Sequence, residues 1–256
     1  MGYLKRQDSG AVRVLVLADP ERRNPLSGEL VEEMTAALEE ARGDDGVRAL
    51  VITGEPPAFS AGADLGYLRR VRELSAEANL EHSRELGELF YRIYTFPKPV
   101  VAAVNGPAIA GGAGLVLASD LAVASPRARI GFTEVRLGFV PALVAVLLVR
   151  HLGEKLAREL LLGGEAVPAE RALEIGLYNR VVEEDRVLEE AVAWAARVAE
   201  GSPTSLALTK ALLSELPGMG LYEGFAHAAL ANAWIRQSAD LAEGLSAFFE
   251  KRRPRF

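Results

Sequence analysis

The 256-residue sequence contains no cysteine and only three histidines, His82, His151 and His227. Without cysteine there can be no disulfide, no thiolate metal site and no cysteine nucleophile. The histidines lie far apart in the sequence, which argues against a histidine-rich metal site. Basic residues number 29 against 35 acidic ones, and this net charge of -6 argues against a nucleic-acid surface, which needs a clustered basic face.

Signals for targeting or membrane insertion are also weak. Lys5 and Arg6 are followed by polar residues rather than by the apolar run of a leader peptide. Residues 99–119 carry no charge and are long enough to span a bilayer. However, Asn105, Pro107 and four glycines within that stretch suit a buried strand, a turn and a helix better. We therefore expect no membrane span and a cytoplasmic protein.

The remaining composition, half apolar and a quarter charged, predicts one large domain, or a core with a smaller appendage, around an ample hydrophobic core. Strands are predicted at 11–18, 47–53, 100–104, 121–124 and 128–132. Helices are predicted after the cap Ser27, at 67–94 and at 111–118. This alternation indicates an α/β layered architecture with mostly parallel or spiralling strands.

From Pro141 onward the pattern favours helices, at 141–151, 154–162, 168–175, 185–200, 203–214 and 221–250. The last of these carries Phe225, Trp234 and Phe248 among other large apolar residues. Such a helix either covers the core or packs on another subunit, and the sequence leaves both possibilities open.

The best-known mechanistic motifs are incomplete. No glycine-rich run continues into a Lys-Ser/Thr pair, so a phosphate-gripping loop is absent, and the glycines at 112–114 fall short of a dinucleotide fingerprint. Residues 58–62 lack one glycine of a nucleophile elbow, and no histidine or aspartate is visibly tied to Ser60. A serine hydrolase is therefore disfavoured.

Two loops of small residues stand out instead, at 59–65 and 110–114, the first after the strand at 47–53 and the second after the strand at 100–104. Small side chains let a ligand approach the main chain, so that backbone N–H groups can act as donors. The second loop also opens a helix, whose unpaired N–H groups favour a developing anion. Two such groups meeting at one oxygen would form an oxyanion hole. The alternative is that these glycines only allow tight packing of helix on strand.

A candidate acid/base lies further along, at Glu134, between apolar residues and just before the apolar run 142–146. A carboxyl group buried there would have a raised pKa, which suits proton transfer near neutral pH. The alternatives are an acid that stabilises a helix start, or an ion pair with Arg136.

Taken together, these segments resemble the crotonase superfamily, specifically enoyl-CoA hydratase/isomerase proteins. The resemblance rests on the loop 58–65, the run 98–106 that leads into Gly111 and Gly112, Asp120, the Glu134 segment, residues 162–164 and the ending 248–252. It extends from about residue 10 to the C-terminus. It implies an α/β fold, a crotonase-like spiral of β-β-α units over residues 1–195. A helical region at 196–256 would mediate assembly into a homotrimer or a hexamer.

The resemblance also implies roles for individual residues. The N–H groups of Ala63 and Gly111 would hold a thioester carbonyl and stabilise the enolate, and Glu134 would be the acid/base. Lys251 would reach the phosphates of coenzyme A, on a neighbouring subunit or its own, although a solvated lysine in a basic tail is a comparable reading. No metal or redox cofactor is implied, because coenzyme A is part of the substrate. The remaining residues assigned to substrate or coenzyme A binding are Arg22, Arg23, Ala61, Asp64, Leu65, Gly112 and Gly114.

One departure from the family pattern affects the reaction. Hydratases of this superfamily often carry two glutamates, and the first of them falls on Gly114 here. We predict reversible syn hydration of a 2-enoyl-CoA in fatty-acid or branched-chain acyl-CoA degradation, with Glu134 alone as acid/base and a second water in the space that Gly114 leaves. A Δ3,Δ2-enoyl-CoA isomerase, a hydrolase on the same fold and a non-catalytic acyl-CoA- or RNA-binding scaffold are the alternatives.

Overall fold

A computed structural model describes residues 2–64, 66, 69 and 72–256. Its main sheet contains six strands, which follow one another across the sheet in the order of the chain. β2 is antiparallel to β1, and every later neighbour is parallel. The strands are β1 (Leu4–Ser9), β2 (Val12–Leu17), β4 (Ala49–Gly54), β6 (Val100–Val104), β8 (Leu121–Ala124) and β11 (Arg180–Val181).

After each of β2, β4, β6 and β8 the chain forms a short strand outside the main sheet, and a helix comes next. The short strands are β3 (Pro25–Leu26), β5 (Gly62–Ala63), β7 (Ala108–Ile109) and β9 (Arg129–Gly131). β3 pairs with β5, and β9 pairs with β7 and with β10 (Ala166–Pro168). The helices are α1 (Gly28–Gly43), α3 (Ala76–Tyr94), α4 (Gly111–Ala118) and α5 (Ala142–Gly163). The predicted spiral of β-β-α units is confirmed.

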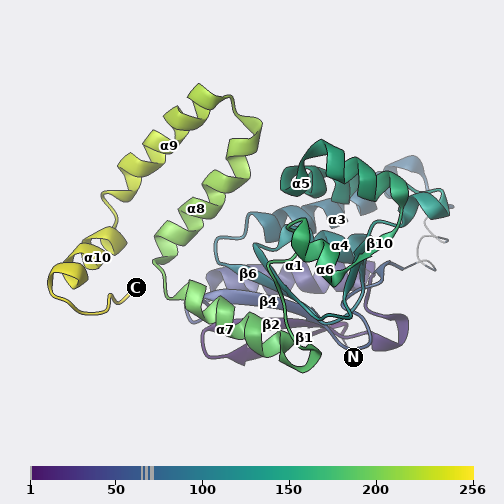
Figure 1. The fold of residues 1–256 in the computed structure, drawn as a ribbon, viewed down its shortest axis with the longest axis horizontal. Helices are drawn as coiled ribbons and strands as arrows, with labels where there is room; N and C mark the ends of the chain where they lie inside the picture. The colour runs from purple at the N-terminus through teal and green to yellow at the C-terminus, as the bar shows by residue number, and fades with distance from the viewer. Residues whose placement is uncertain (1, 65, 67–68, 70–71) are drawn as a thin grey trace.

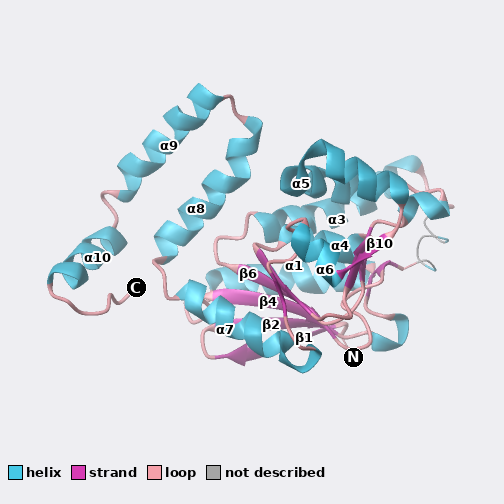
Figure 2. Ribbon diagram, in the orientation of Figure 1, coloured by secondary structure: helices cyan, strands magenta, loops and turns pink. Residues whose placement is uncertain are grey.

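Helices cover the main sheet on both faces (Figures 1 and 2). α7 (Val187–Ala199) packs on β4, β6 and β8 with its alanine-rich side. α1, α3 and α4 lie over the opposite face. A parallel sheet covered in this way has strands that are apolar on both sides, and all five residues of β6 are buried. This burial accounts for the uncharged stretch at 99–119, and no helix in the described residues is long and apolar enough to cross a membrane.

The last three helices stand away from this core (Figure 1). They are α8 (Pro203–Glu215), α9 (Leu221–Ile235) and α10 (Ala239–Phe249). Lys210 of α8 ties this region to the sheet, because its Nζ lies 2.5 Å from Asp120 Oδ2 and 3.1 Å from the carbonyl oxygen of Lys98. α7 continues through residues 195 and 196, so the separate region begins at α8. The shorter helices are α6 (Ala169–Glu174), η1 (Pro20–Arg22), η2 (Glu134–Leu137), η3 (Glu184–Arg186) and η4 (Leu216–Gly218).

Several predicted boundaries are wrong. The helix expected at 67–94 is interrupted at 72–75, which are not helical, and α3 begins at Ala76, where the Ser75 hydroxyl accepts a hydrogen bond from Ala78 N–H and caps it. Residues 67, 68, 70 and 71 lie outside the described residues. The helix expected at 221–250 is interrupted at Ser238, which caps α10 in the same way. β1 was not predicted, because a polar edge strand in which every residue after Leu4 is exposed lacks the apolar alternation of a core strand. The break predicted between 151 and 154 corresponds to the non-helical Gly153 inside α5.

Candidate active site

The two small-residue loops lie side by side. Ser60 N–H donates to the carbonyl oxygen of Pro107 at 3.1 Å, and Ile109 N–H donates to that of Ser60 at 2.9 Å. Gly62, with a φ of 82°, is so close to the second loop that a Cβ atom there would lie 2.4 Å from the carbonyl oxygen of Ile109. The same atom would lie 3.1 Å from the amide nitrogen of Gly111, so only glycine allows this approach. Ala63 follows directly, paired with Leu26 in the β3–β5 ladder.

Gly111 is the first residue of α4, so its N–H group has no acceptor within the helix. The turn before it is strained, because Ala110 has a φ of 51°, which costs a non-glycine residue about 1–3 kcal/mol. A hydrogen bond from Ala110 N–H to the carbonyl oxygen of Gly131, 2.7 Å long, helps to hold this turn. Both Ala63 and Gly111 line one cavity.

Glu134 begins η2 and lines the same cavity, although its side chain is buried and only 9% of the residue is exposed. Its Oε2 atom has no hydrogen-bond partner among the described residues. Burial raises the pKa of the Glu134 carboxyl group, and a hydrogen bond from the backbone opposes that rise only in part. An ion pair with Arg136 is excluded, because that side chain binds Glu165 at 3.0 Å and the carbonyl oxygen of Gly164 at 2.6 Å.

The cavity has a volume of about 1320 Å³, enough for a long ligand. Around Glu134 its wall is mostly apolar and comes from α3, α5 and the segment that joins η2 to α5. The apolar residues here are Leu86, Phe90, Leu137, Phe139, Val140, Leu143 and Val144. Apolar surroundings disfavour the charged form of a carboxyl group, and the raised pKa that results suits general acid/base catalysis near neutral pH.

Only some of the residues predicted to bind coenzyme A line the cavity. Arg22, Ala61 and Asp64 line the cavity, and Arg22 forms ion pairs with Asp64 at 2.8 Å and with Asp19 at 2.5 Å. Arg23 is exposed and does not line the cavity; its carbonyl oxygen accepts the N–H of Ala61 at 2.8 Å. Leu65 lies outside the described residues.

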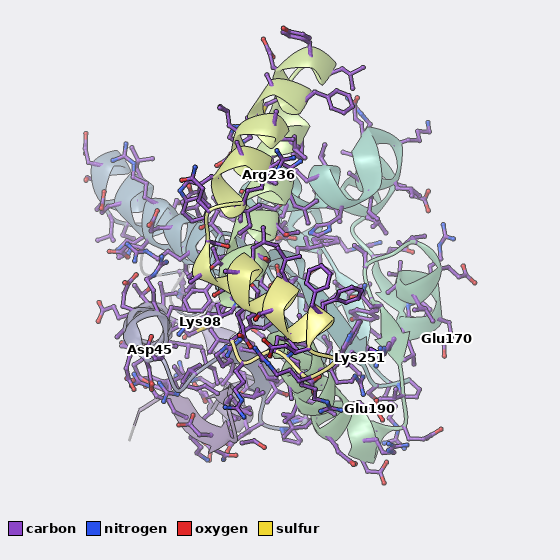
Figure 3. All side chains as sticks on the ribbon, turned by 90° about the vertical axis from the view of Figure 1, so that its left-hand side faces the viewer. Asp45, Lys98, Glu170, Glu190, Arg236 and Lys251 are labelled. Carbon is purple, nitrogen blue, oxygen red and sulfur yellow. The ribbon has the colours of Figure 1, made fainter. Side chains whose placement is uncertain are left out.

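Lys251 follows α10 on the face that carries the C-terminal helices (Figure 3). It does not line the cavity of its own chain.

Gly112 and Gly114 serve packing in this structure. A Cβ atom on Gly112 would lie 2.5 Å from the carbonyl oxygen of Ser60. A Cβ atom on Gly114 would lie 2.5 Å from Phe90 Cζ, so the ring of Phe90 fills the space beside Gly114. The prediction of a second water in that space is therefore wrong. Phe90 was missed because the apolar spacing of α3 predicts its burial but not the partner it packs against.

None of the described residues forms a cluster of carboxylate and histidine groups that could hold a metal ion. The site therefore combines backbone donors at two loops with a single sheltered carboxyl group, arranged on a spiral of β-β-α units. Enzymes that stabilise an oxyanion and move a proton need groups of these two kinds. The sequence profile of the enoyl-CoA hydratase/isomerase family matches residues 7–256, and the chain belongs to that family of enzymes.

Individual relatives align with almost the whole chain. A Thermus thermophilus protein named "putative enoyl-CoA hydratase" is 59% identical over 249 residues, which are 97% of this chain and 98% of the relative. The 2,3-dehydroadipyl-CoA hydratase of Escherichia coli is 35% identical, over 96% of this chain and 94% of its own. The crystal structure of an enoyl-CoA hydratase from Shewanella pealeana superposes with a TM-score of 0.94 at 33% identity, covering 99% of this chain and 96% of that one.

Proposed function

We propose that the protein catalyses the reversible hydration of a 2-enoyl-CoA thioester, in fatty-acid or branched-chain acyl-CoA degradation. The observation that carries this proposal is the presence of Ala63, Gly111 and the buried Glu134 on the wall of one cavity. The first two offer backbone donors for an oxygen, and the third offers a base whose pKa is raised by burial.

In the proposed reaction the thioester carbonyl oxygen accepts hydrogen bonds from the N–H groups of Ala63 and Gly111. The Glu134 carboxylate takes a proton from a water molecule as its oxygen bonds to C3, and the electron pair of the double bond moves onto the thioester oxygen. The resulting enolate collapses as the Glu134 carboxyl group returns the proton to C2. Loss of one such backbone donor typically costs about 10² to 10³ in rate.

The rest of the coenzyme A moiety would lie along Arg22, Ala61 and Asp64. Lys251 would reach its phosphates from a neighbouring subunit, because it does not line the cavity of its own chain. The assembly we propose is a trimer or a dimer of trimers, supported by the exposed Phe225, Trp234 and Phe248 on the C-terminal helices. None of these steps needs a metal or a redox cofactor.

One observation favours a second candidate, a Δ3,Δ2-enoyl-CoA isomerase. Moving a double bond requires one base that removes a proton from one carbon and returns it at another. Phe90 packs on Gly114 at the position of the family's first glutamate, so Glu134 is the one carboxyl group available among the residues matched to that pair.

Incubation of the purified protein with crotonyl-CoA and with a 3-enoyl-CoA tests the proposal. Loss of the crotonyl-CoA absorbance with formation of 3-hydroxybutyryl-CoA supports the hydratase. Conversion of the 3-enoyl-CoA alone would identify an isomerase. Binding of coenzyme A thioesters without turnover of any of them would leave a scaffold that only binds acyl-CoA.

A further inference from the structure

One face of α3 forms a wall of the cavity, and the polarity of its side chains changes along the helix. Asn79, His82, Ser83, Leu86 and Phe90 all line it, at the spacing that places residues on one side of a helix. Phe90, at the end of this row, packs on Gly114, one turn into the helix that Gly111 opens. From Phe90 to His82 the axis of α3 advances by roughly 12 Å, so the row leads away from the reaction centre. The wall changes along this path from apolar to polar.

Arg69 and Arg72 also line the cavity, and in the chain they come just before the N-terminal end of α3, the end that carries Asn79 and His82. Within the described part of the chain neither arginine forms an ion pair. The carboxylate that lines this end is Glu85, and its Oε2 atom already lies 3.4 Å from His82 Nδ1. The polar side chains of Ser83 and Asn79 form hydrogen bonds within their own helix. Ser83 Oγ donates to the carbonyl oxygen of Asn79, and Asn79 Nδ2 donates to the carbonyl oxygen of Ser75. Among the described residues from this stretch of the chain that line the cavity, the two guanidinium groups therefore outnumber the one carboxylate.

The other charged group on the wall that could attract an anion is already neutralised. Arg22 is paired with both Asp19 and Asp64. An anionic group that enters the cavity therefore meets its open cationic partners at the α3 end, beyond the apolar section formed by Leu86 and Phe90. An apolar chain of suitable length with a negative charge at its far end matches this order of surfaces.

We propose that the preferred substrate is a 2-enoyl-CoA whose acyl chain ends in a carboxylate, and that Arg72 and Arg69 bind this carboxylate. This inference rests on the proposed hydratase function and specifies its substrate class. Leu86 and Phe90 contact the methylene groups of the chain, and the guanidinium groups select its charged end. Because both arginines are near solvent, their contribution is expected to be modest, about five- to tenfold in kcat/KM.

The test compares pairs of straight-chain 2-enoyl-CoAs of increasing length, each with a terminal carboxylate or with the isosteric carboxamide. Wild-type enzyme is expected to prefer the acid about five- to tenfold at one optimal length, and this preference should fall as ionic strength rises. Arg69→Gln/Arg72→Gln should reduce it to about twofold or less. Arg84→Gln is the matched control, because this exposed arginine of α3 pairs with Glu81 and does not line the cavity, and it should leave the preference unchanged.

Two results would overturn the inference. One is equal kcat/KM for acid and amide at every length in wild-type enzyme that hydrates crotonyl-CoA. The other is an equal loss for acid and amide in the double variant, which would show that the arginines bind the phosphates shared by all coenzyme A thioesters. Failure to hydrate any enoyl-CoA, by contrast, would refute the proposed function itself.

Discussion

The core around the cavity and the C-terminal helices differ in how many of their large apolar side chains are buried. In the sheet, the helices that cover it and the loops between them, most large apolar side chains are buried, including Phe59, Phe90 and Phe132, although Leu137, Phe139 and Val140 on the cavity wall are exposed. In α8 and α9, by contrast, no described residue is buried, and in α10 Ala247 alone is. The residues exposed there include Leu221, Tyr222, Phe225, Leu230, Trp234, Phe248 and Phe249.

The proposed reaction site and the proposed assembly surface therefore lie in different parts of the chain, apart from Lys251, which would reach coenzyme A from a neighbouring subunit. The two loops and Glu134 are fixed by contacts within the core, through main-chain hydrogen bonds and glycine packing. The C-terminal helices are attached to that core through the Lys210–Asp120 pair but leave an apolar surface exposed, as the proposed assembly would require. Variants of the core should therefore change turnover, and variants of the helices should change assembly.

The largest expected effect comes from Glu134→Gln, which keeps the shape of the side chain but removes its proton chemistry. We expect kcat for hydration to fall by about 10³- to 10⁴-fold. Binding of the hydroxyacyl-CoA product, measured by calorimetry, and the oligomeric state should change little. A variant that retains most of its rate would remove Glu134 from the mechanism.

Gly62→Ala tests the close approach of the two loops. The new methyl group would lie 2.4 Å from the carbonyl oxygen of Ile109, so the loops must separate, and kcat should fall by about 10²- to 10³-fold. Gly10→Ala is the matched control, because Gly10 also has a positive φ, of 59°, but a methyl group there meets nothing within 4 Å. It should cost about 1 kcal/mol of stability and leave kcat unchanged. Equal kcat losses in both variants would contradict the account.

On the helical side, Phe225→Asp/Trp234→Asp places charges on the exposed apolar surface of α9. Each large apolar side chain contributes about 1.5–3 kcal/mol when it is buried, so the assembly should dissociate at micromolar concentrations. Analytical ultracentrifugation of this double variant, with Gln237→Glu as a polar control, checks the expectation. An unchanged sedimentation coefficient would show that α9 lies outside the interface.

Gly114→Ala adds a methyl group against the ring of Phe90, at 2.5 Å from Cζ. Overpacking of this kind should lower the free energy of unfolding by about 1–3 kcal/mol. The loss should be smaller in a Phe90→Leu background, since the shorter side chain leaves room, and a double-mutant cycle in urea measures the coupling. Additive losses would show that the two residues do not share this space.

The smallest expected effect is a shift in the pH dependence of kcat/KM. Burial raises the pKa of Glu134 above its ordinary value of 4.5, and the carboxylate is the form that takes the proton from water. The acidic limb of kcat/KM should therefore have an apparent pKa above 4.5, with about a tenfold loss per pH unit below it.

The same raised pKa has a consequence for stability. The contribution of Glu134 to stability is present at low pH, where the group is protonated, and is lost as pH rises through the folded-state pKa. Glu134→Gln should therefore be more stable than the wild type at neutral pH, as measured by thermal unfolding. An acidic limb at or below 4.5, or a variant that is less stable there, would contradict the burial argument.

Much of this arrangement was accessible from the sequence, because its signals are local. The apolar runs predicted the central strands, and the small residues at 59–65 and 110–114 predicted the loops beside Ala63 and Gly111. What was missed depends on contacts between distant segments. Nothing in the sequence places Phe90 against Gly114, and a single-turn break such as that at Ser238 is hidden by the apolar residues on either side of it.

A crystal structure of the protein with a bound acyl-CoA that cannot be hydrated tests the central claim most directly. The thioester carbonyl oxygen should lie about 2.7–3.1 Å from the amide nitrogens of both Ala63 and Gly111, with the Glu134 carboxyl group facing C2 and C3 of the acyl chain. A thioester oxygen bound by other donors, or a Glu134 side chain turned away from the acyl chain, would contradict it.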